Sequence, residues 1–431
     1  MSEMKDSRIE WIGKIPEHWE TTRLKFITKI RKEKDFMPEN ACYIGLENIK
    51  SGYNELIDTE TTYDEGKQSI CKTGDVLFNK LRPYLNKVFI APYDAYCTNE
   101  LLVFSDYLGS KKYLRYLMSS QLFIEKVMSI TEGTKMPRAD GNEILSFWII
   151  NPPLEEQKQI VSYLDVRCSK IDGAIAQRKA IIEKLKEYKS AVITKAVTKG
   201  LNLDVEMKDS GFKLIGDIPK HWQITRLKFL MIEGKSKIRV GPFGTQLTNK
   251  DLVSSGYWVY TQRTVLDKNF VDNDSFIDKE KFEDLSSFAV YPKDILVTTR
   301  GTIGRICIVP PNSPKGVLHP CLIRFRANQD KILYRLLEYI FNESDYFQSQ
   351  LKYSSNSTII DVVYSDNLKN IIVPVIPIEE QKIIVSYLDS QCTKIDEAIS
   401  KQEQLIAKLE EYRKSIIYYA VTGKIDCRKG A

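Results

Sequence analysis

The sequence predicts an α+β fold in which two mixed α/β domains are joined by two long helices that form an antiparallel coiled coil, as a pseudo-twofold internal repeat. Three observations indicate this fold. One segment recurs after 203 residues, a second recurs after 224 residues, and both copies of the second carry apolar residues at seven-residue spacing. A period near 200 residues is the size of a domain and is too long for a solenoid repeat.

The first repeated segment opens each half of the chain. Residues 12–26 read IGKIPEHWETTRLKF, and residues 215–229 read IGDIPKHWQITRLKF. A catalytic histidine needs a nucleophile or an acid at a matching place, and none is evident. We therefore expect the two His-Trp pairs to be packing anchors, and they are His18 with Trp19 and His221 with Trp222.

The stretches that follow differ between the two halves. Short apolar runs separated by Gly, Pro and Asn indicate strands and helices around a sheet. The clearest matching pair is a strand, a cationic loop and a strand at residues 74–91 and 293–310, and a second loop is expected at 131–140 and 355–361. Short loops that display Arg, Lys and Thr can read base edges in DNA. The candidate DNA-binding residues are Lys80, Arg82, Lys87, Lys135, Arg138, Arg300, Thr302 and Arg305.

For each of these residues an ordinary solvated surface position is the alternative. Other cations gather at residues 29–34, 111–115, 235–239 and 324–326, and such clusters are more often solvated faces than binding sites. Only their presence in both variable stretches favours nucleic acid.

The second repeated segment predicts one long helix per copy. Pro153 and Pro377, each followed by paired glutamates, are typical of a helix start, and Gly200 and Gly423 are typical of a helix end. Arg178 and Gln402 are polar residues at the same heptad position, where they can fix the register of a coiled coil. The residues expected between the helices are Leu164, Ile171, Ile175, Ile182, Leu185, Leu388, Ile395, Ile399, Ile406 and Leu409.

Each helix would be roughly 65 Å long and would need a partner. Because the two copies carry matching seams, we expect them to pair antiparallel within the chain. The alternatives are that each helix packs on its own domain or dimerises with another chain. The expected boundaries are 1–152 for the first domain, 153–200 for the first helix, 201–376 for the second domain, and 377–431 for the second helix and a C-terminal tail.

Composition limits the class of protein. The chain has 431 residues, 43% apolar residues and a net charge of +6, a weak indication of polyanion binding. It has neither a long uncharged apolar run nor an apolar signal core, so we expect a cytoplasmic protein. The eight cysteines form no Cys-x-x-Cys pair and there are only three histidines, so we expect reduced thiols and no metal site. Cys168 and Cys392 match across the repeat and are expected to pack between the helices.

Three fragments resemble enzyme motifs incompletely. Residues 151–154 (NPPL) lack the final aromatic residue with which amino methyltransferases hold a target base, and the second copy lacks the motif. Residues 156–158 (EQK) offer the Glu-x-Lys of metal-dependent nucleases, but they fall on the first turn of a predicted helix. Residues 301–304 (GTIG) lack the Gly-Lys-Ser/Thr ending of a phosphate loop. None of the three indicates a catalytic site.

The alternation of variable and repeated regions, the IGxIPxHWxxxxLKF openings and the P(L/I)EEQKxIVxYLD helices resemble the specificity subunit of type I restriction-modification systems. The resemblance covers essentially the whole chain. It implies a non-catalytic subunit with two target recognition domains, each reading one half of a bipartite, asymmetric site in double-stranded DNA. The helical pair would set the spacer and dock two methyltransferase subunits, with two restriction motor-nuclease subunits joining for cleavage. This chain would bind no cofactor, and S-adenosylmethionine, ATP and Mg would belong to the partner subunits.

Two other functions stay open on the residues alone. The chain could be a DNA methyltransferase or nuclease in its own right, which incubation with DNA and a labelled methyl donor, or with magnesium, would reveal. It could also be a coiled-coil scaffold that does not bind DNA, which a binding assay with defined and random duplexes would distinguish.

Overall fold

The computed structural model describes residues 3–59, 61, 65–202, 204–232, 238–354 and 362–427. The chain divides into two compact units. Unit 1 consists of Met1–Lys179 and Glu403–Ala431, and unit 2 consists of Ala180–Gln402. Each unit therefore contains one α/β domain together with one half of each long helix.

The two predicted helices are confirmed as α4 (Leu154–Lys199) and α10 (Ile378–Val421). The N–H of Gln157 donates to the carbonyl of Pro153 at 3.0 Å, which closes the first turn of α4. The chain leaves both helices through glycines in the left-handed region, at φ +72° for Gly200 and +70° for Gly423. These are the end signals that the sequence predicted, since glycine adopts this conformation at little cost.

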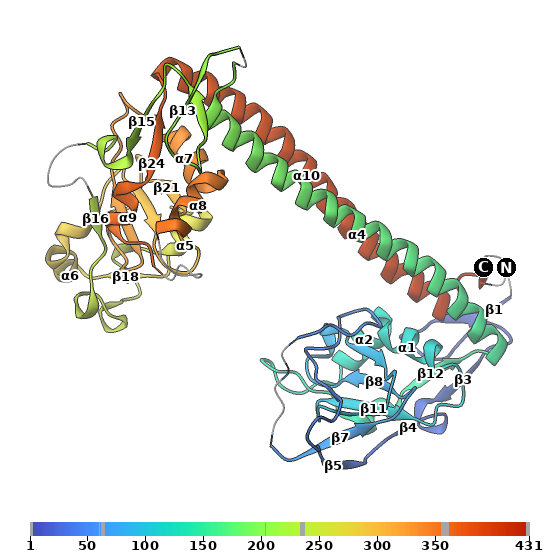
Figure 1. The fold of residues 1–431 in the computed structure, drawn as a ribbon. Helices are drawn as coiled ribbons and strands as arrows, with labels where there is room; N and C mark the ends of the chain where they lie inside the picture. Colours follow the sequence, from blue (N-terminus) through green and yellow to red (C-terminus); the bar gives the residue numbers. More distant parts are fainter. Residues whose placement is uncertain are drawn as a thin grey trace. The chain divides into compact units, whose positions relative to one another are not determined.

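Within each unit, a segment of α4 and a segment of α10 lie side by side and antiparallel (Figure 1). In unit 1, Arg413 Nε donates to Asp172 Oδ1 at 2.8 Å, and in unit 2, Lys189 Nζ donates to Asp396 Oδ2 at 3.0 Å. The second pair lies 17 residues further along α4 and 17 residues further back along α10. Both units therefore use the same antiparallel register, which confirms the predicted pairing.

The α/β part of unit 1 contains two four-stranded sheets. The first, fully antiparallel sheet has the order β4 (Lys29–Ile30), β11 (Leu101–Ser105), β8 (Val76–Asn79) and β9 (Val88–Ile90). The second has the order β5 (Lys34–Phe36), β7 (Lys67–Cys71), β10 (Ala95–Cys97) and β6 (Tyr43–Ile44). Two-stranded pairs are β1 (Met4–Asp6) with β2 (Lys14–Pro16), and β3 (Glu20–Arg23) with β12 (Trp148–Asn151). The helices are α1 (Lys111–Ser119), α2 (Gln121–Met128) and α3 (Gly141–Ser146), with short 3-10 turns η1 (Leu24–Phe26) and η2 (Pro83–Leu85).

Unit 2 repeats this plan. Its antiparallel sheet has the order β16 (Ile238–Val240), β23 (Leu322–Phe325), β20 (Ile295–Thr298) and β21 (Ile306–Ile308). Its second sheet has the order β18 (Phe276–Ile277), β17 (Tyr257–Tyr260), β22 (Gly316–Leu318) and β19 (Ala289–Val290). Two-stranded pairs are β13 (Met207–Asp209) with β14 (Asp217–Pro219), and β15 (Gln223–Arg226) with β24 (Ile372–Val375). The helices are α5 (Gln262–Asp267), α6 (Lys279–Asp284), α7 (Tyr334–Glu343), α8 (Asp345–Ser354) and α9 (Ser365–Asn370), and the 3-10 turns are η3 (Leu227–Phe229), η4 (Gly244–Gln246), η5 (Asn249–Asp251) and η6 (Ser286–Phe288).

The second sheet is where the two units differ. Both contain a parallel pair, β6 with β10 and β17 with β22, and both place an antiparallel strand on the other side of β10 and β22. Unit 1 then adds β5 beside β7, whereas unit 2 adds β18 beside β17, on the opposite edge. A shared framework therefore carries different edges and different loops.

A short strand precedes each long helix, because β12 leads into α4 and β24 leads into α10. Among the residues that the structure describes, none of the helices is long and apolar enough to cross a membrane.

Candidate nucleic-acid interface

Two loops of unit 1 that are far apart in the sequence lie against each other. The N–H of Arg82 donates to the carbonyl of Pro137 at 2.7 Å, and the N–H of Ala139 donates to the carbonyl of Lys80 at 3.0 Å. Residues 80–82 and 137–139 thus form one short antiparallel pairing, which we call the loop ledge. The ledge brings together candidate residues that are more than 50 positions apart in the sequence.

A buried asparagine at the end of β8 shapes the first of these loops. Asn79 Nδ2 donates to the carbonyls of Leu81 and Arg82 at 3.1 and 3.0 Å, and its Oδ1 accepts the N–H of Lys87 at 2.8 Å. Arg82 sits at φ +51°, a conformation that non-glycine residues adopt only under constraint. Asn79 was not among the candidate residues, although a polar residue at the end of a buried apolar run is the signal that could have found it.

The candidate side chains of unit 1 have different surroundings. Lys135 is exposed, and Arg138 is exposed with Nη2 at 2.7 Å from Glu100 Oε1. Lys87 Nζ donates to the carbonyl of Leu46, and burial lowers the pKa of Lys87 from its ordinary value. Lys135 and Arg138 therefore lie open to solvent, while Lys87 is engaged inside the unit.

In unit 2 the loop between β20 and β21 holds the other three candidates. Arg300 and Thr302 are exposed and flank Gly301, which has φ +63°, while Gly304 at φ +73° follows on the same loop. Arg305 differs, because its Nη1 donates to the carbonyl of Asn342. Like Asn79, the buried Thr298 organises the loop, and its Oγ1 accepts the N–H of Arg305 at 3.0 Å.

The N–H of Val363 donates to the carbonyl of Thr299 at 2.9 Å, which is the counterpart of the contact from Ala139 to Lys80. The loop predicted at 355–361 lies outside the described residues, as do Lys235 and Lys237 of a predicted cationic cluster. The described part of unit 2 therefore repeats one half of the ledge.

Several clustered cations turn out to be structural. Arg31 Nε donates to Asp75 Oδ2 at 2.9 Å, beside the first sheet of unit 1. In unit 2, Asp294 accepts from Arg326 Nε at 2.5 Å and from Arg324 Nη1 at 3.3 Å, with the Asp294 side chain fully buried. These cations are committed to buried carboxylates rather than displayed to a ligand.

Six of the ten residues expected between the helices belong to the apolar clusters of the two units. In unit 1, Leu164, Ile171 and Ile175 are buried in one apolar cluster, and Ile406 and Leu409 pack against it. Leu388 is buried in the core of unit 2 with Cys392, and Cys168 is buried in that of unit 1. The others are Ile182 and Ile395, which are buried, and Leu185 and Ile399, which are partly exposed.

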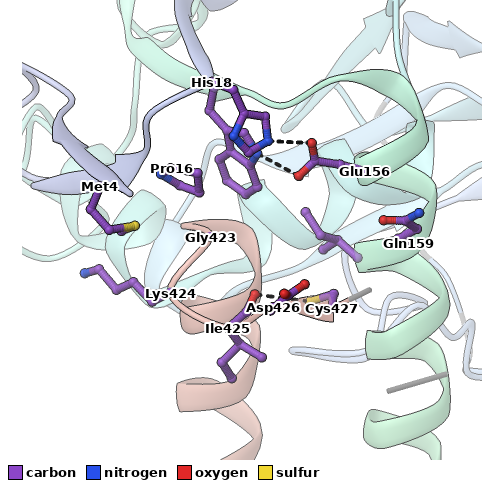
Figure 2. Close-up of a pocket in the computed structure, with 12 residues that line it drawn as sticks. Met4, Pro16, His18, Glu156, Gln159, Gly423, Lys424, Ile425, Asp426 and Cys427 are labelled. Atoms are coloured by element: carbon purple, nitrogen blue, oxygen red, sulfur yellow. Dashed lines mark hydrogen bonds and ion pairs between the residues drawn. The ribbon is translucent and has the colours of Figure 1, made fainter. Parts of the chain in front are cut away.

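The start of each long helix is attached to its own domain by charged and polar residues that the sequence analysis assigned to helix initiation. Glu156 Oε1 lies 2.6 Å from His18 Nε2 (Figure 2). Glu156 Oε2 also accepts from Trp19 Nε1 at 3.0 Å. Glu380 repeats both contacts in unit 2, at 2.9 and 2.8 Å. Trp19 is buried as expected, but His18 is partly exposed and acts through its contact with Glu156.

Next to each of these glutamates stands a buried glutamine. Gln157 Oε1 accepts the N–H of Ser110 at 2.9 Å, and its Nε2 donates to the carbonyl of Pro152 at 2.9 Å. Gln381 does the same in unit 2 with Leu333 and Ile376. The repeated EEQK sequence is therefore a docking motif that holds each helix start on its domain.

Figure 2 also shows the end of α10 beside this junction, where residues 423–427 border a cavity of about 190 Å³ with His18 and Glu156.

All eight cysteines are free thiols. In the described part of the chain, no group of three or more His, Cys, Asp or Glu residues is placed to hold a metal ion.

Comparison with known proteins identifies a protein family whose model matches this chain. The model of the type I restriction modification DNA specificity domain matches residues 16–187 and 244–411. The chain is 26% identical to the type I restriction enzyme MjaVIII specificity subunit of Methanocaldococcus jannaschii, over 96% of this chain and 94% of that protein. It is 25% identical to the putative MjaX specificity subunit of the same organism, over 96% and 95% of the two chains. A solved structure from work on complex assembly and conformational transition of the type I R-M system has the same fold, with a TM-score of 0.69 and 17% identity over 95% of this chain and 99% of that one.

Proposed function

Since the chain belongs to the type I restriction modification DNA specificity family, we propose that each of its two α/β domains reads one half of a bipartite, asymmetric DNA site. The domain of unit 1 reads its half through Lys80, Arg82 and Arg138 of the loop ledge and through the neighbouring Lys135. The domain of unit 2 reads the other half with the loop that carries Arg300 and Thr302. Arginine and lysine contact guanine edges in the major groove, and threonine serves either as donor or as acceptor.

The observation that carries this proposal is a shared framework with unlike loops. Asn79 and Thr298 end equivalent strands and organise equivalent loops, yet the loops display different side chains. Two similar frames with different reading loops suit a site whose two halves have different sequences.

We propose that α4 and α10 set the gap between the two half-sites, since their lengths of 46 and 44 residues are fixed by the repeated sequence. The helices also offer exposed faces for methyltransferase subunits, and restriction subunits join the complex for cleavage. The chain itself is non-catalytic and binds no cofactor. S-adenosylmethionine, ATP and Mg act in the partner subunits, and the complex works in the cytoplasm.

The test is to express the chain with its methyltransferase partner in a host that lacks DNA methylation, and then to sequence the methylated positions. We expect one bipartite motif with unequal halves and a constant gap. Substitution of Arg300 should alter only one half of that motif. Methylation by the purified chain alone, with S-adenosylmethionine, would contradict the proposal and favour an enzyme.

A further inference from the structure

A groove of about 520 Å³ lies beside the loop ledge in unit 1. Partly buried apolar side chains from β4, β11 and α3 line it, namely Ile30, Leu102 and Leu145. Four lysines line it as well, and we call this site the lysine groove: Lys25, Lys29, Lys32 and Lys80.

Four lysines against one carboxylate, Asp140, leave the lining of the lysine groove with an excess of positive charge. The amino groups of Lys29, Lys32 and Lys80 make no hydrogen bond or ion pair within the described part of the chain. The acidic residue of the lining, Asp140, uses Oδ1 to accept the N–H groups of Asn142 and Glu143 at 2.7 and 3.1 Å. Like charges held around one groove repel one another unless an anion enters, so the groove favours a polyanionic ligand.

Arg31 provides the contrast within the same segment. It lies between Lys29 and Lys32 in the sequence, yet its guanidinium is paired with Asp75 and Glu33. The hydrogen bond that Arg31 donates to Asp75 raises the pKa of Arg31 despite the opposing effect of burial. Carboxylates therefore lie close to the segment that carries Lys29 and Lys32, yet they pair with Arg31 and not with these lysines.

Lys25 also belongs to a turn that both units share. Its Nζ lies 5.3 Å from the ring centre of Phe26, and Lys228 Nζ lies 5.1 Å from that of Phe229. Both rings are more than half exposed, at 65% and 56%. If the two domains read unlike half-sites, residues that are the same in both suit contact with what the half-sites share, which is the sugar–phosphate backbone.

We propose that the lysine groove binds the sugar–phosphate backbone of the half-site read by unit 1, and that Lys228 makes the matching backbone contact in unit 2. This inference rests on the proposed function. Lys80 belongs to both the groove and the loop ledge, so a backbone held in the groove places the ledge at the base edges. Phosphate contacts then set the position and ledge contacts set the sequence.

The experiment uses the full chain assembled with its methyltransferase partner. The triple variant Lys25→Gln, Lys29→Gln, Lys32→Gln is compared with Lys5→Gln, Lys14→Gln, Lys72→Gln, which removes the same charge from exposed lysines of unit 1 outside the groove. Binding to a duplex with the methylated site and to an unrelated duplex is measured over a salt series. Thermal unfolding and the ratio of subunits in the complex are measured for each variant.

The groove variant should bind both duplexes about 10- to 100-fold more weakly at 0.15 M salt. Affinity falls as salt rises, and the magnitude of this slope of log affinity against log salt should decrease by about 2.7, or about 0.9 per lost phosphate contact. Lys228→Gln should lower the slope by about 0.9. The preference for the site duplex should stay unchanged, and the control triple should keep the wild-type slope.

Three outcomes would overturn the groove proposal. A wild-type slope in the groove variant means that these lysines contact no phosphate. A loss of site preference with an unchanged slope means that they read bases. A loss of subunit assembly with normal DNA binding by the assembled fraction means that the groove docks a protein. In each case the wild-type complex still prefers its site and the proposed function stands, whereas a wild-type complex without any site preference would remove both.

Discussion

Asp389 of α10 binds the domain of unit 2 through two side chains. Its Oδ1 accepts from Tyr339 Oη at 2.6 Å and from Arg335 Nε at 2.9 Å, and Asp165 repeats the tyrosine contact in unit 1 with Tyr116 at 2.7 Å. Burial acts to raise the pKa of Asp389, but the hydrogen bonds from Tyr339 and Arg335 hold it below the ordinary value of 3.8. The repeated YLD sequence is thus a second docking contact between helix and domain.

A lowered folded-state pKa gives this contact a defined pH dependence. The contribution of Asp389 to stability is complete above its unfolded pKa, near 3.8, and is lost as the pH falls through the lower folded value. We expect Asp389→Asn to lower the Tm at pH 7 by about 2–4 °C, as for a partly exposed pair. The difference from wild type should shrink below about pH 4. A difference that persists at pH 2.5 would contradict this account, and Asp366→Asn, in an exposed pair on α9, is the control.

The buried glutamine next to the helix start should matter more. Gln381 is 1% exposed and satisfies one backbone N–H and two carbonyls. Gln381→Ala leaves these groups, which are buried or partly buried, without a partner, and we expect it to destabilise unit 2 by about 2–4 kcal/mol in urea unfolding. Lys382→Ala, on an exposed neighbour, should change stability by less than about 0.5 kcal/mol. Equal effects of the two substitutions would exclude a docking role for Gln381.

A side chain that reads a base should affect one half-site alone. We expect Arg300→Ala to weaken binding to the methylated duplex by about 1–3 kcal/mol and to relax the sequence requirement in the half read by unit 2. Arg305→Ala is the variant for comparison with Arg300→Ala, because the Arg305 guanidinium donates a hydrogen bond to the carbonyl of Asn342 within unit 2. If Arg300→Ala weakened all duplexes equally, Arg300 would be a phosphate contact instead.

At the scale of elements, the end of α10 is packed more closely than the middle of α4. Gly423 has φ +70°, and a side chain there would collide with Pro16 and with Trp19. Gly173 lies in the interior of α4 with nothing within 4 Å of the place where a Cβ would stand. Gly173 therefore serves as the control position for Gly423 within unit 1.

We expect opposite effects of adding one methyl group at these positions. Gly423→Ala should destabilise unit 1 by more than about 1 kcal/mol, because the left-handed conformation and the collision both oppose it. Gly173→Ala should stabilise it by roughly 0.5–1 kcal/mol through the higher helix propensity of alanine. Urea unfolding of both variants checks this, and a stabilising Gly423→Ala would show that the helix end is loosely packed.

The elements also show which features the sequence could predict. The long helices follow from heptads that run over many turns, and their antiparallel pairing was expected because both copies carry matching seams. The β8–β9 and β20–β21 pairs follow from two apolar runs around one loop. The meeting of residues 80–82 with 137–139 could not be predicted, because it depends on tertiary pairing between distant loops. The hydrogen bonds that Arg305 and Lys87 donate to backbone carbonyls could not be predicted either, since a sequence does not show which cationic side chains find acceptors inside the fold.

At the scale of the whole molecule, repetition separates what is common from what is specific. The residues that recur in both units bind helix to domain, as Gln157 and Gln381 do, or form the turns of Lys25 and Lys228. The loops after Asn79 and Thr298 do not recur. A chain built in this way can change the sequence that one domain reads without changing how that domain is held on its helices.

The measurement that tests the central claim most directly is the spacing of the methylated motif after one heptad is removed from both helices. Deleting residues 176–182 and 403–409 keeps the heptad register and retains both the pair of Asp172 with Arg413 and that of Lys189 with Asp396. The helices become shorter by about 10 Å, so the gap between the half-sites should shrink by roughly three base pairs while both half-site sequences persist. A motif with the original gap would contradict the claim that α4 and α10 set the spacing.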